Sequence, residues 1–190
     1  HSSHQLGRTG YHAMSVRPFE EELPELGKGV YIDEDATVIG RVSIGENSSI
    51  WPACVLRGDI NTVSIGARTN IQDGSVLHVT HDSDYVPGGY ALSIGDEVTV
   101  GHKAMLHACN IGNRCLIGMS AIVLDGAVIE DNVVVGAGSL VAQRKRLESG
   151  YLYLGQPARR VRKLSQKELD YFVYSADHYV RLKDRYLNQE

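Results

Sequence analysis

The chain has 190 residues, 43% of them hydrophobic, and its 19 lysines and arginines against 23 aspartates and glutamates give a formal net charge of −4. This balance argues against a nucleic-acid partner, and no apolar run approaches the roughly 20 residues of a membrane-spanning helix. An odd number of cysteines (Cys54, Cys109 and Cys115) argues against a disulfide framework, so we expect one globular domain in the reducing cytoplasm.

Residues 1–13 are polar, contain three histidines and are out of phase with everything that follows. We interpret them as an expression leader, with the natural start at Met14, and exclude their histidines from any site. Residues 14–30, which contain Pro18 and Pro24, are expected to lead into the repeated part of the chain.

Aliphatic residues recur every six positions from about Tyr31 to Leu147, within a predicted β-helix domain of residues 31–164, and a glycine directly follows many of them. Neither a helix nor a simple strand has a period of six, whereas hexapeptide repeats are typical of a parallel β-helix. Small or β-branched residues four places later, including Cys54 and Cys115, suit the corners of such a coil as core residues. The predicted interior positions are Ile32, Val38, Ile44, Ile50, Leu56, Ile65, Ile71, Leu77, Ile94, Val100, Leu106, Ile111, Ile117, Val123, Ile129, Val135 and Val141.

Two interruptions break this period. Leu56 and Ile65 are nine positions apart instead of six, and Leu77 and Ile94 are seventeen apart, which leaves an eleven-residue loop. Irregular segments on a rigid scaffold are where functional residues concentrate, so both interruptions are candidate sites.

The repeat ends at the breaker pair in Gly155-Gln156-Pro157-Ala158. Beyond it, Ser165 and Glu168 have the spacing of a capping box, which predicts a C-terminal helix within residues 165–190 that runs towards Leu187. The predicted apolar face, expected to pack on the coil or on a neighbouring subunit, consists of Leu169, Phe172, Val173, Ala176, Tyr179 and Val180.

Basic residues gather on both sides of the end of the repeat. A solvated surface explains such a cluster, and an anion-binding role is the alternative. The cluster consists of Arg144, Lys145, Arg146, Arg159, Arg160, Arg162 and Lys163.

His78 and His107 each follow an interior leucine, Leu77 or Leu106. Three hexads close one triangular coil, so these leucines stack once the long loop is removed, and the two histidines share a face of adjacent coils. Backbones about 4.8 Å apart let two imidazoles reach one metal ion. His102 belongs to another face, about 15–20 Å away in the same chain, and can join them only from a second copy, as three-fold symmetry would allow.

Two interpretations of these histidines stay open. They could be three unrelated polar side chains on the surface of a sheet. Alternatively, three neutral imidazoles with an open fourth position are the arrangement of a catalytic zinc site, which lowers the pKa of bound water to about 7.

Several motifs together resemble the gamma-class carbonic anhydrases and their bacterial relatives, over roughly residues 30 to 160. The motifs are Leu56-Arg57-Gly58-Asp59, Asn70-Ile71-Gln72-Asp73-Gly74, Leu77-His78, Val100-Gly101-His102 and Leu106-His107. The resemblance implies a left-handed β-helix, against the usual right-handed crossover rule. It also implies a homotrimer with zinc, iron or cobalt between subunits, and reversible hydration of CO2 to bicarbonate by a hydroxide held on the metal.

Carried over residue by residue, the resemblance implies that His78, His102 and His107 are the metal ligands. Gln72 matches the side chain that positions the hydroxide and the substrate.

Arg57, Asp59 and Asp73 match a charged set that pairs across the subunit interface near the metal. Without the resemblance, these three residues could be plain ion pairs that hold the trimer together. An arginine–carboxylate pair at a subunit contact contributes geometry as much as energy.

The chain departs from the best-studied form of this enzyme at two acidic positions, where it has Ile60 and His81. A glutamate proton shuttle is therefore missing, and His81 either replaces it, since a histidine titrates near neutral pH, or only caps the loop. The segment with Tyr174 and His178 resembles the one that brings a polar group over the metal, so either residue could play that part.

Three function classes remain after the sequence is considered alone. The first is a metal-dependent lyase that hydrates CO2, which the three-histidine set favours. The second is a hexapeptide-repeat acyltransferase or thioesterase, because the end motif at residues 155–158 recurs in such enzymes. The third is a metal-binding trimer without significant turnover.

Overall fold

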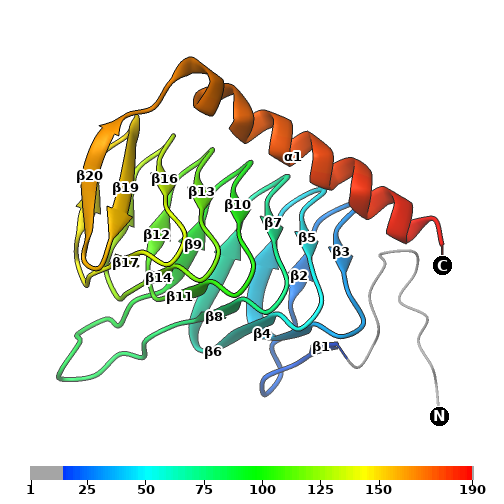
Figure 1. The fold of residues 1–190 in the computed structure, drawn as a ribbon. Helices are drawn as coiled ribbons and strands as arrows, with labels where there is room; N and C mark the ends of the chain where they lie inside the picture. The colour runs from blue at the N-terminus through cyan, green and yellow to red at the C-terminus, as the bar shows by residue number, and fades with distance from the viewer. Residues whose placement is uncertain (1–14, 190) are drawn as a thin grey trace, which may run out of the picture.

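A computed structural model describes residues 15–189 as a parallel β-solenoid with one long C-terminal helix (Figure 1). The parallel β-helix predicted from the period of six is thereby confirmed. The expected leader at residues 1–13, together with Met14, lies outside the described residues. No helix among the described residues is long and apolar enough to cross a membrane.

The strands form three faces of a prism, and we number the faces in the order in which the chain visits them in one coil. Two longer strands, β4 (Thr37–Ile44) and β6 (Val55–Ile65), bend from face 1 to face 2. The other strands of face 1 are β1 (Val16–Arg17), β8 (Val76–His78), β11 (Met105–His107), β14 (Ile122–Val123) and β17 (Leu140–Val141). Those of face 2 are β2 (Glu25–Leu26), β9 (Leu92–Ile94), β12 (Asn110–Ile111), β15 (Val128–Ile129) and β18 (Arg146–Leu147).

Face 3 is a separate sheet that ends in an antiparallel hairpin. Its parallel strands are β3 (Tyr31–Ile32), β5 (Ser49–Ile50), β7 (Asn70–Ile71), β10 (Thr99–Val100), β13 (Leu116–Ile117), β16 (Val134–Val135) and β19 (Tyr151–Gly155). The last strand, β20 (Ala158–Lys163), folds back on β19. At the other end, β1 and β2 already pair with β4, so the coil begins before residue 31.

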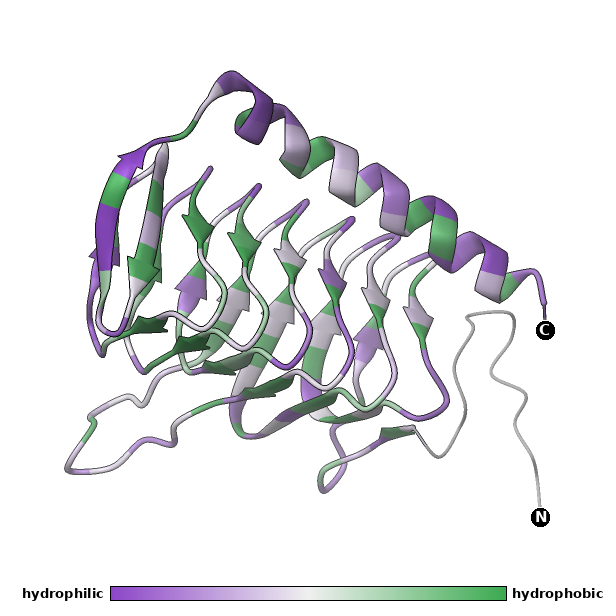
Figure 2. Cartoon of the chain, viewed as in Figure 1, coloured by the Kyte–Doolittle hydropathy of each residue, from purple (hydrophilic) through white to green (hydrophobic). Residues whose placement is uncertain are grey.

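Every predicted interior aliphatic residue is buried, and these residues stack in register from coil to coil. Leu77, for example, lies opposite Leu106, and Ile94 lies opposite Ile111. Figure 2 shows hydrophobic residues recurring on the strands of successive coils, with more hydrophilic residues on the turns between them. Each buried aliphatic side chain contributes about 1.5–3 kcal/mol by leaving water, so the repeat itself is the main source of stability.

The first interruption is not a loop but part of β6. The register of β6 on β4 jumps between Gly40 and Val42, so the extra residues of β6 form a bulge where the strand turns the prism corner. Gly58 allows this bend, because a Cβ there would lie 2.4 Å from the Arg41 carbonyl oxygen. The bulge turns Asp59 towards the next coil, where it meets His78.

The second interruption does form a loop. It leaves the coil after β8, returns at β9 and projects well beyond the prism (Figure 1). An antiparallel bridge between Thr80 and Tyr90 closes its base, so the hexads on either side remain stacked as predicted.

The C-terminal helix α1 (Gln166–Leu187) begins at the predicted cap. The Ser165 hydroxyl accepts a hydrogen bond from the Glu168 amide, and the Glu168 carboxylate accepts one from the Ser165 amide. α1 contacts β3, β5 and β10, so it covers much of face 3 (Figure 1).

The predicted apolar face of this helix is only partly right. Phe172 is buried as expected, but Val173 is 40% exposed, and Ser175 and Lys183 are buried instead. Polar partners on the coil decide these positions, since Ser175 shares a hydrogen bond with Thr99 and the Lys183 ammonium donates to an asparagine.

Candidate metal centre

The register of β8 and β11 places His78 directly opposite His107 on face 1, as the spacing predicts. The Nδ1 atom of His78 lies 3.3 Å from the Nε2 atom of His107. The His78 side chain is 15% exposed and that of His107 is 31% exposed, so both rings are largely covered but still accessible. We call this pair and its partners the two-histidine site.

A carboxylate fixes the second nitrogen of each of these rings. His78 Nε2 lies 3.0 Å from Asp59, and His107 Nδ1 lies 2.6 Å from Asp125. Thr80 donates a hydrogen bond to the other oxygen of Asp125. Metal-binding histidines almost always have such a partner on the nitrogen that faces away from the metal.

Arg57 and Asp59 form an ion pair within one chain, with Arg57 Nη1 2.5 Å from Asp59 Oδ2. Partial burial alone would raise the pKa of Asp59, but hydrogen bonds from the Ile60 amide, His78 and Arg57 outweigh it and lower the pKa to about 2. Asp59 therefore stays ionised at neutral pH, as a group that orients His78 must.

The two-histidine site has the dimensions that a tetrahedral ion needs. Two nitrogens bound at 2.0–2.1 Å to such an ion are about 3.3 Å from each other. His78 Nδ1 and His107 Nε2 have this separation, and their remaining nitrogens already face carboxylates. The spacing of these two nitrogens therefore suits two of the ligands of a tetrahedral ion such as zinc. Within residues 15–189 of one chain, however, no group of three or more His, Cys, Asp or Glu side chains could hold a metal.

His102 lies on a different face, just after β10 of face 3. Its Nδ1 is 3.1 Å from Asp73, which leaves Nε2 without a protein partner among the described residues. Both side chains are about half exposed, at 46% and 51%. Each of the three predicted ligands thus has a carboxylate on one nitrogen. We call His102, Asp73 and Gln72 the one-histidine site.

Gln72 is buried and is held by a chain of hydrogen bonds that reaches the helix. Its Nε2 donates to Asn70, the Asn70 amide donates to Thr99, and Thr99 shares a hydrogen bond with Ser175 of α1. Gln72 Oε1 accepts no hydrogen bond from the described residues, so it remains available as an acceptor. The packing of α1 therefore positions the amide.

A groove of about 460 Å³ runs between α1 and face 3, and Gln72 and His102 both line it. His178 and Tyr179 line its helix side. Burial, with Asp73 and Tyr171 nearby, raises the pKa of Tyr179, so its hydroxyl stays protonated. Tyr174, the other helix residue expected near the metal, is 61% exposed and does not line this groove.

His81 lies in the projecting loop and is exposed. Its side chain makes no hydrogen bond or ion pair with residues 15–189, and both roles considered for it, proton shuttle and loop cap, stay open. It follows Thr80, whose hydroxyl contacts Asp125.

Asp125 and Ser175 were not identified from the sequence. Asp125 lies two places after Val123, the interior residue that stacks on Leu106, so coil stacking could have placed it beside His107. No sequence signal marks Ser175, because its role depends on how the helix lies on face 3.

The chain also matches known proteins. A family model described as bacterial transferase hexapeptide (six repeats) matches residues 24–58 and 108–143. Protein YrdA of Escherichia coli (strain K12) is 58% identical over 174 residues, which cover 92% of this chain and 95% of that protein. The mitochondrial gamma carbonic anhydrase 2 of Arabidopsis thaliana is 44% identical over 163 residues, which cover 85% of this chain and 58% of that protein. The chain belongs to the gamma carbonic anhydrase family.

Solved structures show that the gamma carbonic anhydrase family shares its coil with proteins of other names. A hexapeptide transferase family protein from Anaplasma phagocytophilum superposes with a TM-score of 0.84 at 38% identity, over 91% of this chain and 98% of that one. Because one fold serves several chemistries, the function has to be argued from the site.

Proposed function

We propose that this protein is a metal-dependent lyase that interconverts CO2 and bicarbonate. The observation that supports it most is the geometry of the two-histidine site. His78 Nδ1 and His107 Nε2 lie 3.3 Å apart, and both rings are oriented by carboxylates. Membership of the gamma carbonic anhydrase family agrees with this reaction.

We further propose that the complete site lies between copies of the chain in a homotrimer. The two-histidine site is on face 1 and His102 is on face 3, so one chain cannot bring all three rings to one ion. A cyclic trimer would place face 1 of each copy against face 3 of the next and would build the site at each interface. Gln72, beside His102, would come with it.

In this proposal the ion, zinc or alternatively iron or cobalt, supplies Lewis acidity that makes bound water acidic near neutral pH. The chain's own residues prepare the ligands for it. Asp59, Asp125 and Asp73 hold the protons on His78 Nε2, His107 Nδ1 and His102 Nδ1, which leaves the opposite nitrogens free to bind. Gln72 Oε1 accepts a hydrogen bond from the attacking oxygen and orients it towards CO2.

The proton released by hydration must reach the solvent, and two histidines are candidates for its transfer. His81 is exposed at the start of the projecting loop, and His178 lines the groove that also contains His102. An imidazole is a common proton-transfer group at neutral pH. We favour His81, because its exposure gives it direct access to buffer.

The decisive experiment is a CO2-hydration assay on anaerobically purified protein whose metal content is measured in the same sample. Hydration above the buffer background is expected at full occupancy. Gln72→Ala should lower both kcat and kcat/KM, since Gln72 acts on the hydration step. Full metal occupancy without hydration would refute the lyase and would favour a metal-binding assembly without turnover.

One observation favours a second candidate, acyl transfer or thioester hydrolysis. The groove beside His102 has a volume of about 460 Å³, which is far more than CO2 requires and is typical of sites for larger ligands. Hydrolysis or transfer from acyl-coenzyme A by protein that lacks CO2 hydration would establish this alternative.

We also place the protein in the cytoplasm. All three cysteines are free and buried, as in proteins of a reducing compartment. Fractionation of cells that express the natural protein would test this location.

A further inference from the structure

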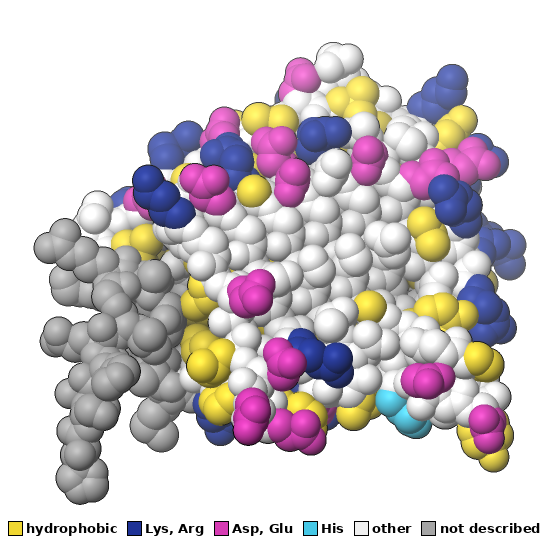
Figure 3. Space-filling view, turned by 180° about the vertical axis from the view of Figure 1, so that it is seen from behind, with side chains coloured by type: hydrophobic (Ala, Val, Ile, Leu, Met, Phe, Trp, Pro, Cys, Tyr) yellow, Lys and Arg dark blue, Asp and Glu magenta, His cyan; other side chains and the backbone are white. Residues whose placement is uncertain are grey.

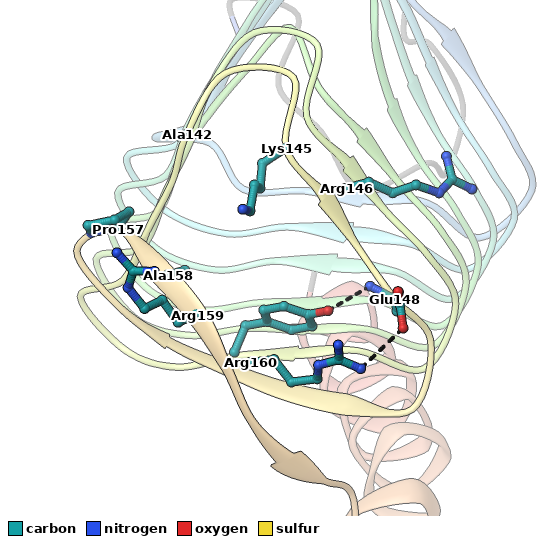
Figure 4. Close-up of a pocket in the computed structure, with 9 residues that line it drawn as sticks. Ala142, Lys145, Arg146, Glu148, Pro157, Ala158, Arg159 and Arg160 are labelled. Carbon is teal, nitrogen blue, oxygen red and sulfur yellow. Dashed lines mark hydrogen bonds and ion pairs between the residues drawn. The ribbon is translucent and has the colours of Figure 1, made fainter.

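The C-terminal end of the prism carries a pocket that the proposed lyase does not use. Its volume is about 520 Å³, and it lies between the last coil and the hairpin β19–β20 (Figure 4). Val141, Leu147 and Tyr153 are the last interior residues of faces 1, 2 and 3, respectively. The pocket therefore occupies the place where a further coil would have stacked.

The floor of this end pocket is rigid. Tyr153 is 5% exposed and belongs to the hydrophobic core. Its hydroxyl accepts a hydrogen bond from the Glu148 amide at 2.9 Å, which fixes the last turn of the coil against the hairpin (Figure 4). A ligand that enters the pocket would meet a preformed surface.

The wall of the end pocket is basic. Lys145, Arg146, Arg159 and Arg160 line it, with Glu148 as the one carboxylate among the lining residues. Figure 3 shows lysines and arginines gathered at the edge of the molecule opposite the grey N-terminal segment, although the whole chain has a net charge of −4. The positive charge is therefore local.

Two of the four basic side chains of the end pocket already have an ion-pair partner, and two do not. Arg146 pairs with Glu130 at 2.7 Å and points away from the pocket (Figure 4). Arg160 is held in place by Glu148 at 3.2 Å and lies over the Tyr151 ring at 4.5 Å. Lys145 and Arg159 have no ion pair with any residue in the described range 15–189.

Backbone donors add to these charges. β17 and β18 are the terminal strands of their sheet, so one edge of each is unpaired within residues 15–189. Both edges face the end of the prism, and Ala142, directly after β17, lines the pocket. A sheet edge can contribute N–H groups to an anion site, and Ala142 lines the same pocket as the two unpaired cations, Lys145 and Arg159.

We propose that the end pocket binds a small anion that carries two or more phosphate groups. Lys145 and Arg159 both line the pocket and carry charges that no ion pair within residues 15–189 neutralises, and an anion with two or more phosphate groups matches this charge better than a single carboxylate does. The planar guanidinium groups of Arg159 and Arg160 suit phosphate oxygens. The negative charge of the rest of the chain disfavours long nucleic acids and confines the site to small ligands.

The test is calorimetric titration of the full-length, metal-loaded protein with tripolyphosphate and, separately, with inorganic phosphate. Saturable binding of one tripolyphosphate per chain is expected, at least tenfold tighter than binding of phosphate. Lys145→Gln with Arg159→Gln should weaken tripolyphosphate binding at least tenfold. Any heat from contact of tripolyphosphate with the metal is common to all variants and cancels in the comparison.

Arg17→Gln with Lys28→Gln is the matched control. Both residues are exposed at the opposite end of the prism, and the charge removed is the same. This control should bind tripolyphosphate within twofold of the parent protein. Lys145→Arg with Arg159→Lys, which keeps the charges, should bind within a few fold, and thermal unfolding of each variant will show that it is folded.

Three results would overturn the proposal. They are no saturable binding of tripolyphosphate to the parent protein, equal weakening in the pocket variant and the matched control, and inorganic phosphate binding as tightly as tripolyphosphate. CO2 hydration should be the same in the parent protein and in the pocket variant, so the outcome is independent of the lyase proposal.

Discussion

His78 and His107 occupy equivalent positions on two adjacent coils, with the facing nitrogens 3.3 Å apart. This relationship depends on register alone, because each histidine directly follows an interior leucine that stacks on the other leucine. A slip of one residue would turn both rings into the core and both leucines into solvent, which the hydrophobic energy of the stack prevents. The core therefore sets the spacing of the candidate ligands.

A site shared between copies predicts complementation between two inactive variants. His102→Ala and the double variant His78→Ala with His107→Ala should each lose metal and CO2 hydration. Coexpressed in equal amounts, the two chains would assemble randomly and restore about a quarter of the interfaces, and hence about a quarter of the activity. If all ligands came from one chain, no mixture would recover activity. Unchanged thermal unfolding of each variant is the control for folding.

Asp125 should tune metal affinity without contacting the metal. Asp125→Asn removes the charge that orients His107, so metal affinity should fall about 10–100-fold while the coil stays folded. Asp84→Asn, an exposed change in the projecting loop, is the matched control and should leave affinity unchanged. Competition with a chromogenic chelator measures both. Equal metal affinity in the two variants would show that Asp125 does not influence metal binding.

His81 should limit turnover but not the encounter with substrate. In weak buffer, His81→Ala should lower kcat about tenfold or more, leave kcat/KM nearly unchanged and be partly rescued by added imidazole. His178→Ala is the informative comparison, because this residue lines the groove beside His102. If only His178→Ala shows a lower kcat with an unchanged kcat/KM, His178 is the proton shuttle. If neither variant shows this change, neither histidine is the shuttle.

The cysteines should be unreactive in the folded protein. Burial raises the pKa of Cys54 to about 11 and of Cys115 to about 12, and it raises the pKa of Cys109 further. Since the thiolate is the reactive form, a disulfide reagent at pH 8 should label no thiol in the native state and three after unfolding. Rapid labelling of any one thiol in native protein would contradict the burial of all three cysteines in the core.

The helix cap should respond to acid in a defined range. Hydrogen bonds from Arg162 and from Ser165 lower the pKa of Glu168 from 4.5 to about 2. A carboxylate whose pKa is lower in the folded state than in the unfolded state stabilises the fold when the pH is above its unfolded-state pKa. This stabilisation is lost as the pH falls through its folded-state pKa. The parent protein should have the higher Tm, and its difference from the Tm of Glu168→Gln should be constant above about pH 5.5. This difference should shrink as the pH falls towards 2. A difference that does not vary with pH would show that the cap acts without the charge.

The sequence by itself determined the coil, its interior and the stacking of His78 on His107. Each hexad is a short local unit, and a period of six leaves only one way to bury every aliphatic residue. The helix cap at Ser165 is local as well, since it requires only two side chains three positions apart. The assignment of His102 to another face followed from the same counting.

Other features were decided only by the tertiary structure. β6 continues through the first interruption of the period and turns a corner there, because Gly58 allows its backbone to approach Arg41. The helix buries Ser175 instead of Val173, because its rotation depends on partners on face 3. The basic residues near the end of the repeat form a pocket only once β20 folds back over the last coil. These contacts join segments far apart in the chain, and their geometry depends on side-chain packing that no periodicity records.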